Sequence, residues 1–222
     1  LDFQVDNLFP GLHRLKSKRL ANIVTLPILK DGEQVIGDST QIALYLEQRY
    51  PERPLLPTDA AQRAEVLELE EQFDRLGVHV RRWLYGQIKQ WDSVMHAMLK
   101  VYRPLLGLRD LMKPVLINGV QRLYGVTPPR VAKSQAELLE GLALIESRIH
   151  GDPSRYLVGE QLTLADISAA ALFAPLFTPA GTPWEGIAGH DAKTQAFLDE
   201  LHAHPAGQWV MRRYAEDRQR RS

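Results

Sequence analysis

Residues 25–40 read TLPILKDGEQVIGDST and contain the features that decide the fold of the N-terminal part. Two short apolar runs, 25–29 and 34–36, predict β-strands. The dipeptide Asp31-Gly32 between them is typical of a two-residue β-hairpin turn. The stretch therefore predicts two antiparallel strands joined by a tight turn.

A helix is expected directly after the hairpin. Asp38 or Ser39 is a good N-cap, because a short polar side chain can accept a hydrogen bond from the first helical turn. Pro51 ends the helical pattern. Before it, apolar residues recur at helical spacing, namely Ile42, Leu46 and Tyr50.

The same unit holds two possible binding features. Pro27 lies within an apolar strand, where it cannot donate a ladder hydrogen bond. A cis bond after Leu26 would expose backbone groups to a peptide-like ligand, whereas a trans proline would only mark a strand edge. The unpaired N–H groups of the helix start, with the Ser39 hydroxyl, suit a carboxylate, and Asp38 could accept from an ammonium group. Simple N-capping would favour the same two residues.

The residues before the hairpin show two further patterns. Leu1 to Asp6 alternates apolar and polar side chains, which predicts a half-buried strand. His13 to Arg19 is a basic stretch.

The residues after the hairpin unit predict a linker and then helices. Prolines between positions 51 and 57 stiffen a segment in which Leu55 and Leu56 could plug onto a domain surface. A first long helix has an apolar stripe of Val66, Leu69, Phe73, Leu76, Val80 and Leu84, and an opposite face with Glu65, Glu68, Glu70, Glu71, Arg75 and Arg81.

The remaining helices follow from the same spacing. The region from Trp91 to Tyr124 is helical, and Pro104 and Pro114 are expected to break it. Thr163 opens another helix. Three apolar stripes mark the other helices, with residues Leu138, Leu142, Ile145 and Ile149; Phe197 and Leu201; and Val210 and Tyr214.

Composition excludes several classes of function. The 222 residues contain 27 Lys and Arg against 27 Asp and Glu, so no overall charge draws the chain to nucleic acid or to an anionic membrane. Without cysteine the chain has no disulfide, cysteine-ligated metal or cysteine nucleophile. The apolar run from Ile167 to Phe177 is shorter than the ~20 residues of a membrane helix. The seven histidines lack metal-ligand spacing, so we expect no metal site. Because the charge is balanced and the apolar run is short, we expect no membrane or nucleic-acid partner.

Three motifs in this order resemble the glutathione transferase superfamily. They are the strand–Pro27–hairpin–Asp38-Ser39–helix unit, the linker sequence 54–57, and residues 156–167, YLVGEQLTLADI. The resemblance is to cytosolic, bacterial-type members and singles out no class. It implies a mainly α fold, with a thioredoxin-like α/β N-terminal domain and an all-helical C-terminal domain. The corresponding boundaries are residues 1–52 for the glutathione-binding domain, 53–60 for the linker and 61–222 for the helical domain.

The resemblance also implies roles for individual residues. The residue before a cis-proline, Leu26 before Pro27, would pair its main chain with the cysteinyl part of glutathione, and Asp38 and Ser39 would hold the γ-glutamyl end. Candidates for the glycine carboxylate are His13, Arg14, Lys16 and Thr25, with a solvated basic face as the alternative.

Two segments of the helical domain also receive roles from the resemblance. Thr163 and Asp166 would form a reciprocal cap, which is structural rather than catalytic. The stretch from Arg81 to Tyr85 would line a second-substrate pocket, or else pack in the core or at a subunit interface.

The thiol-activating residue of this family has no counterpart in the chain. Leu1 to Phe3 matches the family's second strand, so we expect that the first βα unit, roughly 20–30 residues, is missing. The expected function is attack of a glutathione thiolate on a small hydrophobic electrophile by a cytoplasmic homodimer without a metal. The alternative is a non-catalytic binding or protein-interaction module. The catalytic residue, second substrate and reaction subtype stay unassigned.

Overall fold

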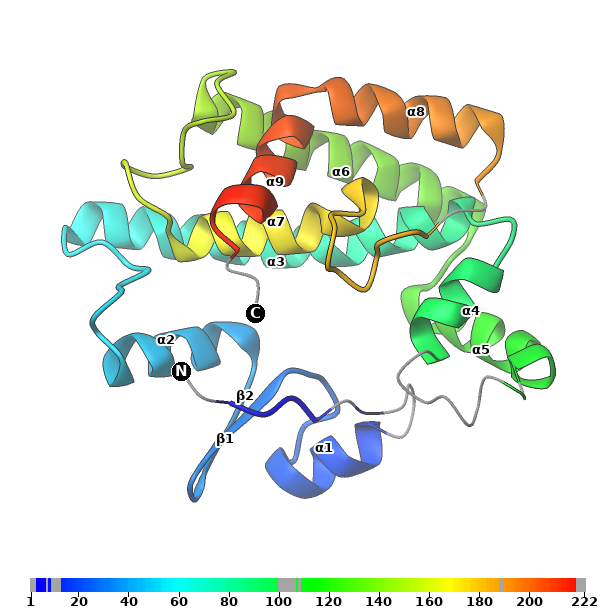
Figure 1. Cartoon of the computed structure of the whole chain (residues 1–222), viewed down its shortest axis with the longest axis horizontal. Helices are drawn as coiled ribbons and strands as arrows, with labels where there is room; N and C mark the ends of the chain where they lie inside the picture. The colour runs from blue at the N-terminus through cyan, green and yellow to red at the C-terminus, as the bar shows by residue number, and fades with distance from the viewer. Residues whose placement is uncertain are drawn as a thin grey trace.

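The computed structural model describes residues 3–6, 8, 13–99, 107, 109–187 and 190–218. A small α/β part lies below a larger layer of helices, and two further helices lie at one side (Figure 1). The architecture is mainly α, as the sequence predicted.

The α/β part consists of α1 (His13–Ala21), β1 (Ile28–Asp31), β2 (Gln34–Gly37) and α2 (Ser39–Arg49). The two strands pair antiparallel, with Ile28 opposite Gly37. The turn is Gly32-Glu33, one residue later than the dipeptide suggested, and Gly32 has the positive φ of 58° that glycine adopts without strain. The predicted hairpin and the helix after it are confirmed. The prediction that Pro27 lies within the first strand is wrong, because β1 begins only at Ile28.

The predicted strand from Leu1 to Asp6 is wrong in its described part. Residues 3–6 form no strand, and the side chains of Phe3 and Val5 are 56% and 65% exposed. An alternating pattern yields a strand only where a neighbouring strand accepts its hydrogen bonds and a core accepts its apolar face. Within the described residues the sheet contains only β1 and β2. Leu1 and Asp2 lie outside them.

Helices make up the rest of the fold, and α3 (Ala60–Gln87) is its longest element. Helices α6 (Pro128–Ile149) and α7 (Leu164–Phe177) pack along α3. The remaining helices are α4 (Asp92–Leu99), α5 (Arg109–Tyr124), α8 (Ala192–Ala203) and α9 (Pro205–Glu216).

The core lies among α3, α6 and α7. The stripe predicted for α6 is buried throughout, and so are most residues of the stripe predicted for α3. Gly141 allows the three helices to approach closely, because a Cβ there would lie 2.6 Å from Phe173 and 2.8 Å from Leu76. No described helix combines the length and the hydrophobicity that a transmembrane span requires.

The prediction that Pro114 breaks a helix is wrong. Helix α5 continues through Pro114. Proline costs a helix one N–H donor, and at the exposed position 114 that loss falls on the solvated side of the helix. Pro104, the other predicted break, lies outside the described residues.

The linker holds the α/β part against the helices. The Glu47 carboxylate of α2 accepts hydrogen bonds from the backbone N–H groups of Leu55 (2.9 Å) and Leu56 (3.1 Å). The Leu164 N–H donates to the Leu55 carbonyl at 3.0 Å. The side chain of Leu56 is buried, so the expected plugging of the linker is confirmed.

Candidate functional site

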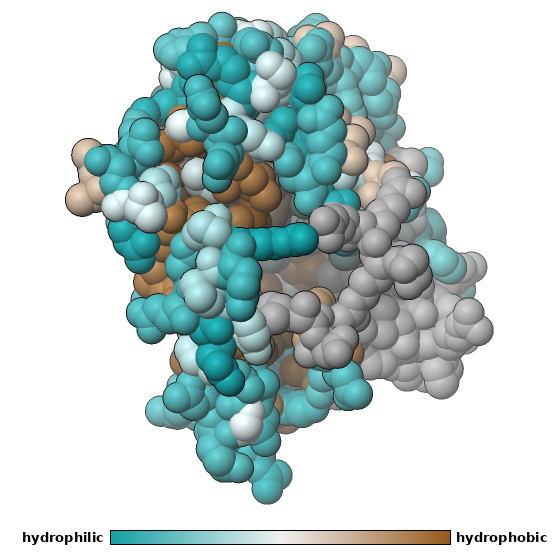
Figure 2. All heavy atoms as spheres, turned by 60° about the vertical axis from the view of Figure 1, so that its left-hand side comes forward, coloured by the Kyte–Doolittle hydropathy of each residue, from teal (hydrophilic) through white to brown (hydrophobic). Residues whose placement is uncertain are grey.

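A cavity of about 870 Å³ lies between α2 and the helices α3 and α7. Hydrophobic side chains gather in a hollow between the two parts of the molecule (Figure 2). The cavity is lined by Pro27, Ser39, Ile42, Ala43, Leu46, Glu47, Tyr50, Glu52, Arg53, Leu55, Glu70, Asp74, Leu164, Ile167, Ser168, Ala171 and Leu172.

Pro27 and Ser39, two of the four predicted site residues, line this one cavity. The Leu26–Pro27 peptide bond is cis, as predicted. Leu26 is 47% exposed, and its backbone forms no hydrogen bond with the described residues. The Ser39 hydroxyl is exposed and likewise has no hydrogen-bond partner among them. Leu26 and Asp38 are neighbours of the lining residues and are not part of the lining itself.

Asp38 caps helix α2. Its Oδ1 atom accepts hydrogen bonds from the backbone N–H groups of Thr40 (3.0 Å) and Gln41 (3.1 Å). The N-capping interpretation is therefore correct for Asp38, and only Oδ2 remains for an ammonium group. The residue has a φ of 74°, a left-handed conformation that costs a non-glycine residue of order 1–3 kcal/mol. The N–H and O–H groups of Ser39, the next residue, lie at the positive end of the α2 dipole and form no hydrogen bond with a described group.

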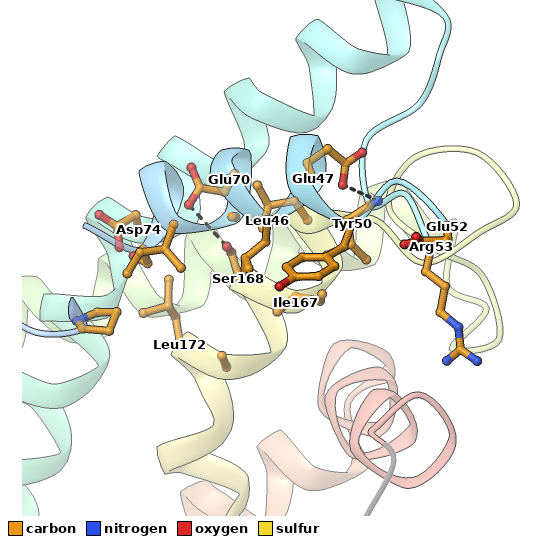
Figure 3. A pocket seen from close by; sticks show the side chains of 17 residues that line it. Leu46, Glu47, Tyr50, Glu52, Arg53, Glu70, Asp74, Ile167, Ser168 and Leu172 are labelled. Carbon is orange, nitrogen blue, oxygen red and sulfur yellow. Dashed lines mark hydrogen bonds between the residues drawn. The ribbon is translucent and has the colours of Figure 1, made fainter. Parts of the chain in front are cut away.

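Glu70 lines the cavity with its carboxylate, and its predicted position was wrong. We expected it on the exposed face of α3, yet it is only 4% exposed. Its carboxylate accepts hydrogen bonds from the hydroxyls of Thr40 (2.9 Å) and Ser168 (3.4 Å), the second of which is drawn in Figure 3. Burial is the main cause that raises the pKa of this carboxyl, and the negative charge of Asp74 adds to it. Its spacing of four residues after Val66 could have indicated burial.

The other end of the cavity combines apolar and charged side chains. Tyr50 lies close to Leu46 and Ile167, whereas Arg53 extends away from them (Figure 3). This end offers apolar surface beside an exposed cation.

The basic residues proposed for a glycine carboxylate lie elsewhere. None of His13, Arg14, Lys16 and Thr25 lines the cavity. Lys16 forms an ion pair with Asp6. The structure therefore singles out none of the four.

The stretch from Arg81 to Tyr85 contributes to the core and not to this cavity. The Trp83 ring packs at 5.2 Å from Phe197, and Tyr85 stacks at 5.9 Å from Trp91. Both side chains are buried. The core-packing alternative is correct for these aromatic residues.

The predicted cap of Thr163 and Asp166 is present at the start of α7. The Asp166 carboxylate accepts hydrogen bonds from the Thr163 N–H (2.8 Å) and hydroxyl (2.7 Å). It also accepts one from the Leu157 N–H at 2.8 Å, which the sequence did not reveal. Burial raises the pKa of the Asp166 carboxyl, and these donors act in the opposite direction. Asp166 is fully buried and does not line the cavity, which fits the expected structural role.

Comparison with known families identifies both parts of the chain. Residues 1–54 match the model of the glutathione S-transferase N-terminal domain, and residues 128–205 match that of the C-terminal domain. The two matches together span more than half of the chain.

The chain belongs to the glutathione transferase superfamily.

Curated relatives agree with this assignment. The chain is 25% identical to glutathione S-transferase 1 of Dianthus caryophyllus over 173 residues, 77% of this chain and 64% of that protein. It is 27% identical to a zeta-class glutathione S-transferase of Euphorbia esula over 143 residues, 64% of this chain and 49% of that protein. It is 38% identical to a glutathione S-transferase of Triticum aestivum over 155 residues, 69% of this chain and 57% of that protein. The matched region thus spans about half to two thirds of these relatives.

A solved structure supports the fold. The chain superposes on the beta-etherase LigF from Sphingobium sp. strain SYK-6 with a TM-score of 0.53 and 22% identity. The superposition covers 90% of this chain and 83% of that one. At this identity the likeness concerns the fold alone.

Proposed function

We propose that this member of the superfamily binds glutathione at the Ser39 end of the cavity and promotes attack of its thiolate on a small hydrophobic electrophile. The observation that carries the proposal is the meeting of Pro27 and Ser39, which lie on either side of the β-hairpin, at one cavity. The family uses glutathione as its substrate. Leu26 and Ser39 offer hydrogen-bonding groups that no described protein group uses.

The chemistry of the helix start suits the γ-glutamyl end of glutathione. Its α-carboxylate would receive hydrogen bonds from the Ser39 N–H and hydroxyl, at the positive end of the α2 dipole. The cysteinyl backbone would pair with the exposed main chain of Leu26. Asp38 holds the first turn of α2 in place through its two capping bonds.

The proposed reaction depends on ionisation of the bound thiol. A free thiol has a pKa of about 8.5, so only a small fraction is thiolate at neutral pH. A nearby hydrogen-bond donor, the helix field and fixed orientation would raise that fraction and the rate. We assign no residue as the donor to the thiol. The apolar surface of Leu46, Ile167 and Leu172 supports a hydrophobic second substrate.

The wider proposal keeps the division predicted from the sequence. Residues 1–52 would form the glutathione-binding domain, 53–60 the linker and 61–222 the helical domain. Members of the family usually dimerise and are generally cytosolic, which supports a cytoplasmic homodimer.

A calorimetric titration tests the proposed binding. Glutathione should bind with measurable heat. In the α-linked isomer Glu-Cys-Gly the α-carboxyl is part of the peptide bond and cannot reach the Ser39 donors as a carboxylate, so this isomer should bind at least about tenfold more weakly. Equal affinity for the two peptides, or no binding of glutathione, would contradict the proposed site.

A further inference from the structure

The Glu70 carboxylate joins three helices directly beside the proposed glutathione site. Glu70 belongs to α3, the Thr40 hydroxyl that donates to it belongs to α2, and the Ser168 hydroxyl belongs to α7. Glu70 and Ser168 also line the cavity, together with Ser39. The contact therefore connects the helical part with the first turn of α2.

This carboxylate lacks a cationic partner in the described part of the chain. Its hydrogen bonds there come from two neutral hydroxyls, and the charged groups that face it, Asp74 and Asp38, are both acidic. A buried carboxylate without a cation destabilises a fold more than an apolar side chain of similar size would. Stability alone therefore does not explain a glutamate at this position.

Thr40 gives the carboxylate its connection to the site. The Thr40 hydroxyl is held by Glu70 at 2.9 Å, and its backbone N–H is held by Asp38 at 3.0 Å. Ser39 lies between Asp38 and Thr40 in the chain, so its backbone is fixed from both sides. A site that binds by hydrogen bonds needs its donors held to within about 0.5 Å.

We propose that Glu70 is a positioning residue, which holds the first turn of α2 through Thr40 so that Ser39 meets the γ-glutamyl end of glutathione. The inference rests on the proposed function and adds to it a residue of the helical part that does not itself touch the substrate. In this arrangement glutathione affinity depends on one bond between the two parts of the molecule.

Four variants and two controls test this role by calorimetric titration with glutathione. Thr40→Val and Glu70→Met each delete the bond while retaining the size of the side chain, and each should weaken binding roughly tenfold. The double variant should bind no more weakly than either single variant, because all three lack the same bond. Thr40→Ser, which keeps the hydroxyl, should retain wild-type affinity.

The controls separate this contact from general effects on the fold. Glu68→Gln changes an exposed glutamate of the same helix, and Thr194→Val removes another hydroxyl that bonds between segments, to Gln87 at 3.4 Å. Both should bind glutathione like the wild type. Glu70→Met should also keep or raise the melting temperature while losing affinity, a combination that a purely structural role would not produce.

The outcomes distinguish this inference from the proposed function. If wild-type protein binds no glutathione, the proposed function and the inference both fail. If the wild type binds and Thr40→Val and Glu70→Met bind equally well, only the positioning role is overturned. Additive losses in the double variant would also overturn it, because the two residues would then act independently.

Discussion

Single residues decide which hydrogen-bonding groups remain open for a ligand. Asp38 and Ser39 are adjacent polar residues, but Asp38 uses one carboxylate oxygen to cap helix α2. The Ser39 hydroxyl forms no hydrogen bond with any described protein group, and Ser39 lines the cavity. Binding at this position is therefore expected from Ser39, with Asp38 in a supporting role.

Ser39→Ala should weaken glutathione binding by about 1–2 kcal/mol, because it removes a hydrogen bond to a charged group. This corresponds to roughly a five- to thirtyfold rise in Kd. Titration calorimetry measures the change. Ser147→Ala, which removes an exposed hydroxyl that bonds the carbonyl of Leu144, is the control and should leave Kd unchanged. An unchanged Kd in Ser39→Ala would remove Ser39 from the site.

Glu70 should also affect how stability depends on pH. Burial raises the pKa of its carboxyl above the ordinary value of 4.5, so the folded chain holds the proton more tightly than the unfolded chain. Its contribution to stability is then fully present at low pH and is lost as the pH rises from about 4.5 through the raised pKa.

Glu70→Gln should therefore flatten the fall in unfolding free energy above pH 4.5, and urea unfolding at several pH values measures it. Glu68→Gln, an exposed change on the same helix, should leave the profile as it is. A Glu70→Gln profile that coincides with the wild-type profile would show that burial does not perturb this carboxyl.

At the scale of elements, the start of α7 depends on a buried cap that reaches beyond its own helix. Asp166 binds the first turn through Thr163 and also holds the preceding loop through the Leu157 N–H. Helix α7 packs against α3 and α9. A displaced first turn of α7 would therefore disturb the packing of the core. The cap is far more buried than the N-cap of α8, where Asp191 accepts one bond from Thr194.

Asp166→Ala should lower the free energy of unfolding by about 2–4 kcal/mol, because it leaves buried N–H groups of two segments without an acceptor. Asp191→Ala, the matched cap on a more exposed helix, should cost about 1 kcal/mol. Urea unfolding measures both. Glutathione affinity of folded Asp166→Ala protein should stay at the wild-type value, and a loss of affinity at unchanged stability would contradict its structural role.

At the scale of the whole molecule, burial is distributed unevenly. Among the described residues before Leu56, only Ser17 is buried, whereas α3, α6 and α7 supply most of the core. Two-stranded sheets have little stability of their own in water. The α/β part therefore depends on its attachment to the helices through the linker.

Hydrogen exchange should reveal this difference. Amides of β1, β2 and α2 should exchange by local opening at rates roughly two orders of magnitude above those at the centre of α3. Glutathione at about 100 times its Kd should slow exchange in α2 by an amount equivalent to at most about 2.7 kcal/mol. Uniform protection across both parts would show that the molecule opens as one unit. That result would contradict the expectation that the α/β part opens more easily than the helices.

The sequence by itself determined the local elements of this protein and its family. The hairpin, the Asp38 cap, the α6 stripe and the Thr163–Asp166 cap follow from neighbours within a few residues, whose side chains and backbone interact whatever surrounds them. The resemblance to the family predicted Pro27 and Ser39 as site residues, and both line the cavity.

Only the tertiary structure decided what depends on distant segments. The alternation of residues 3–6 yields no strand because neither described strand, β1 or β2, accepts them into the sheet, and Pro114 is tolerated because α5 exposes it. Glu70 is buried because α2 and α7 close over it, which the polar character of one side chain does not reveal. Hydrogen-bond partners and burial across a cavity are properties of the packed chain, since they arise between residues that sequence spacing does not bring together.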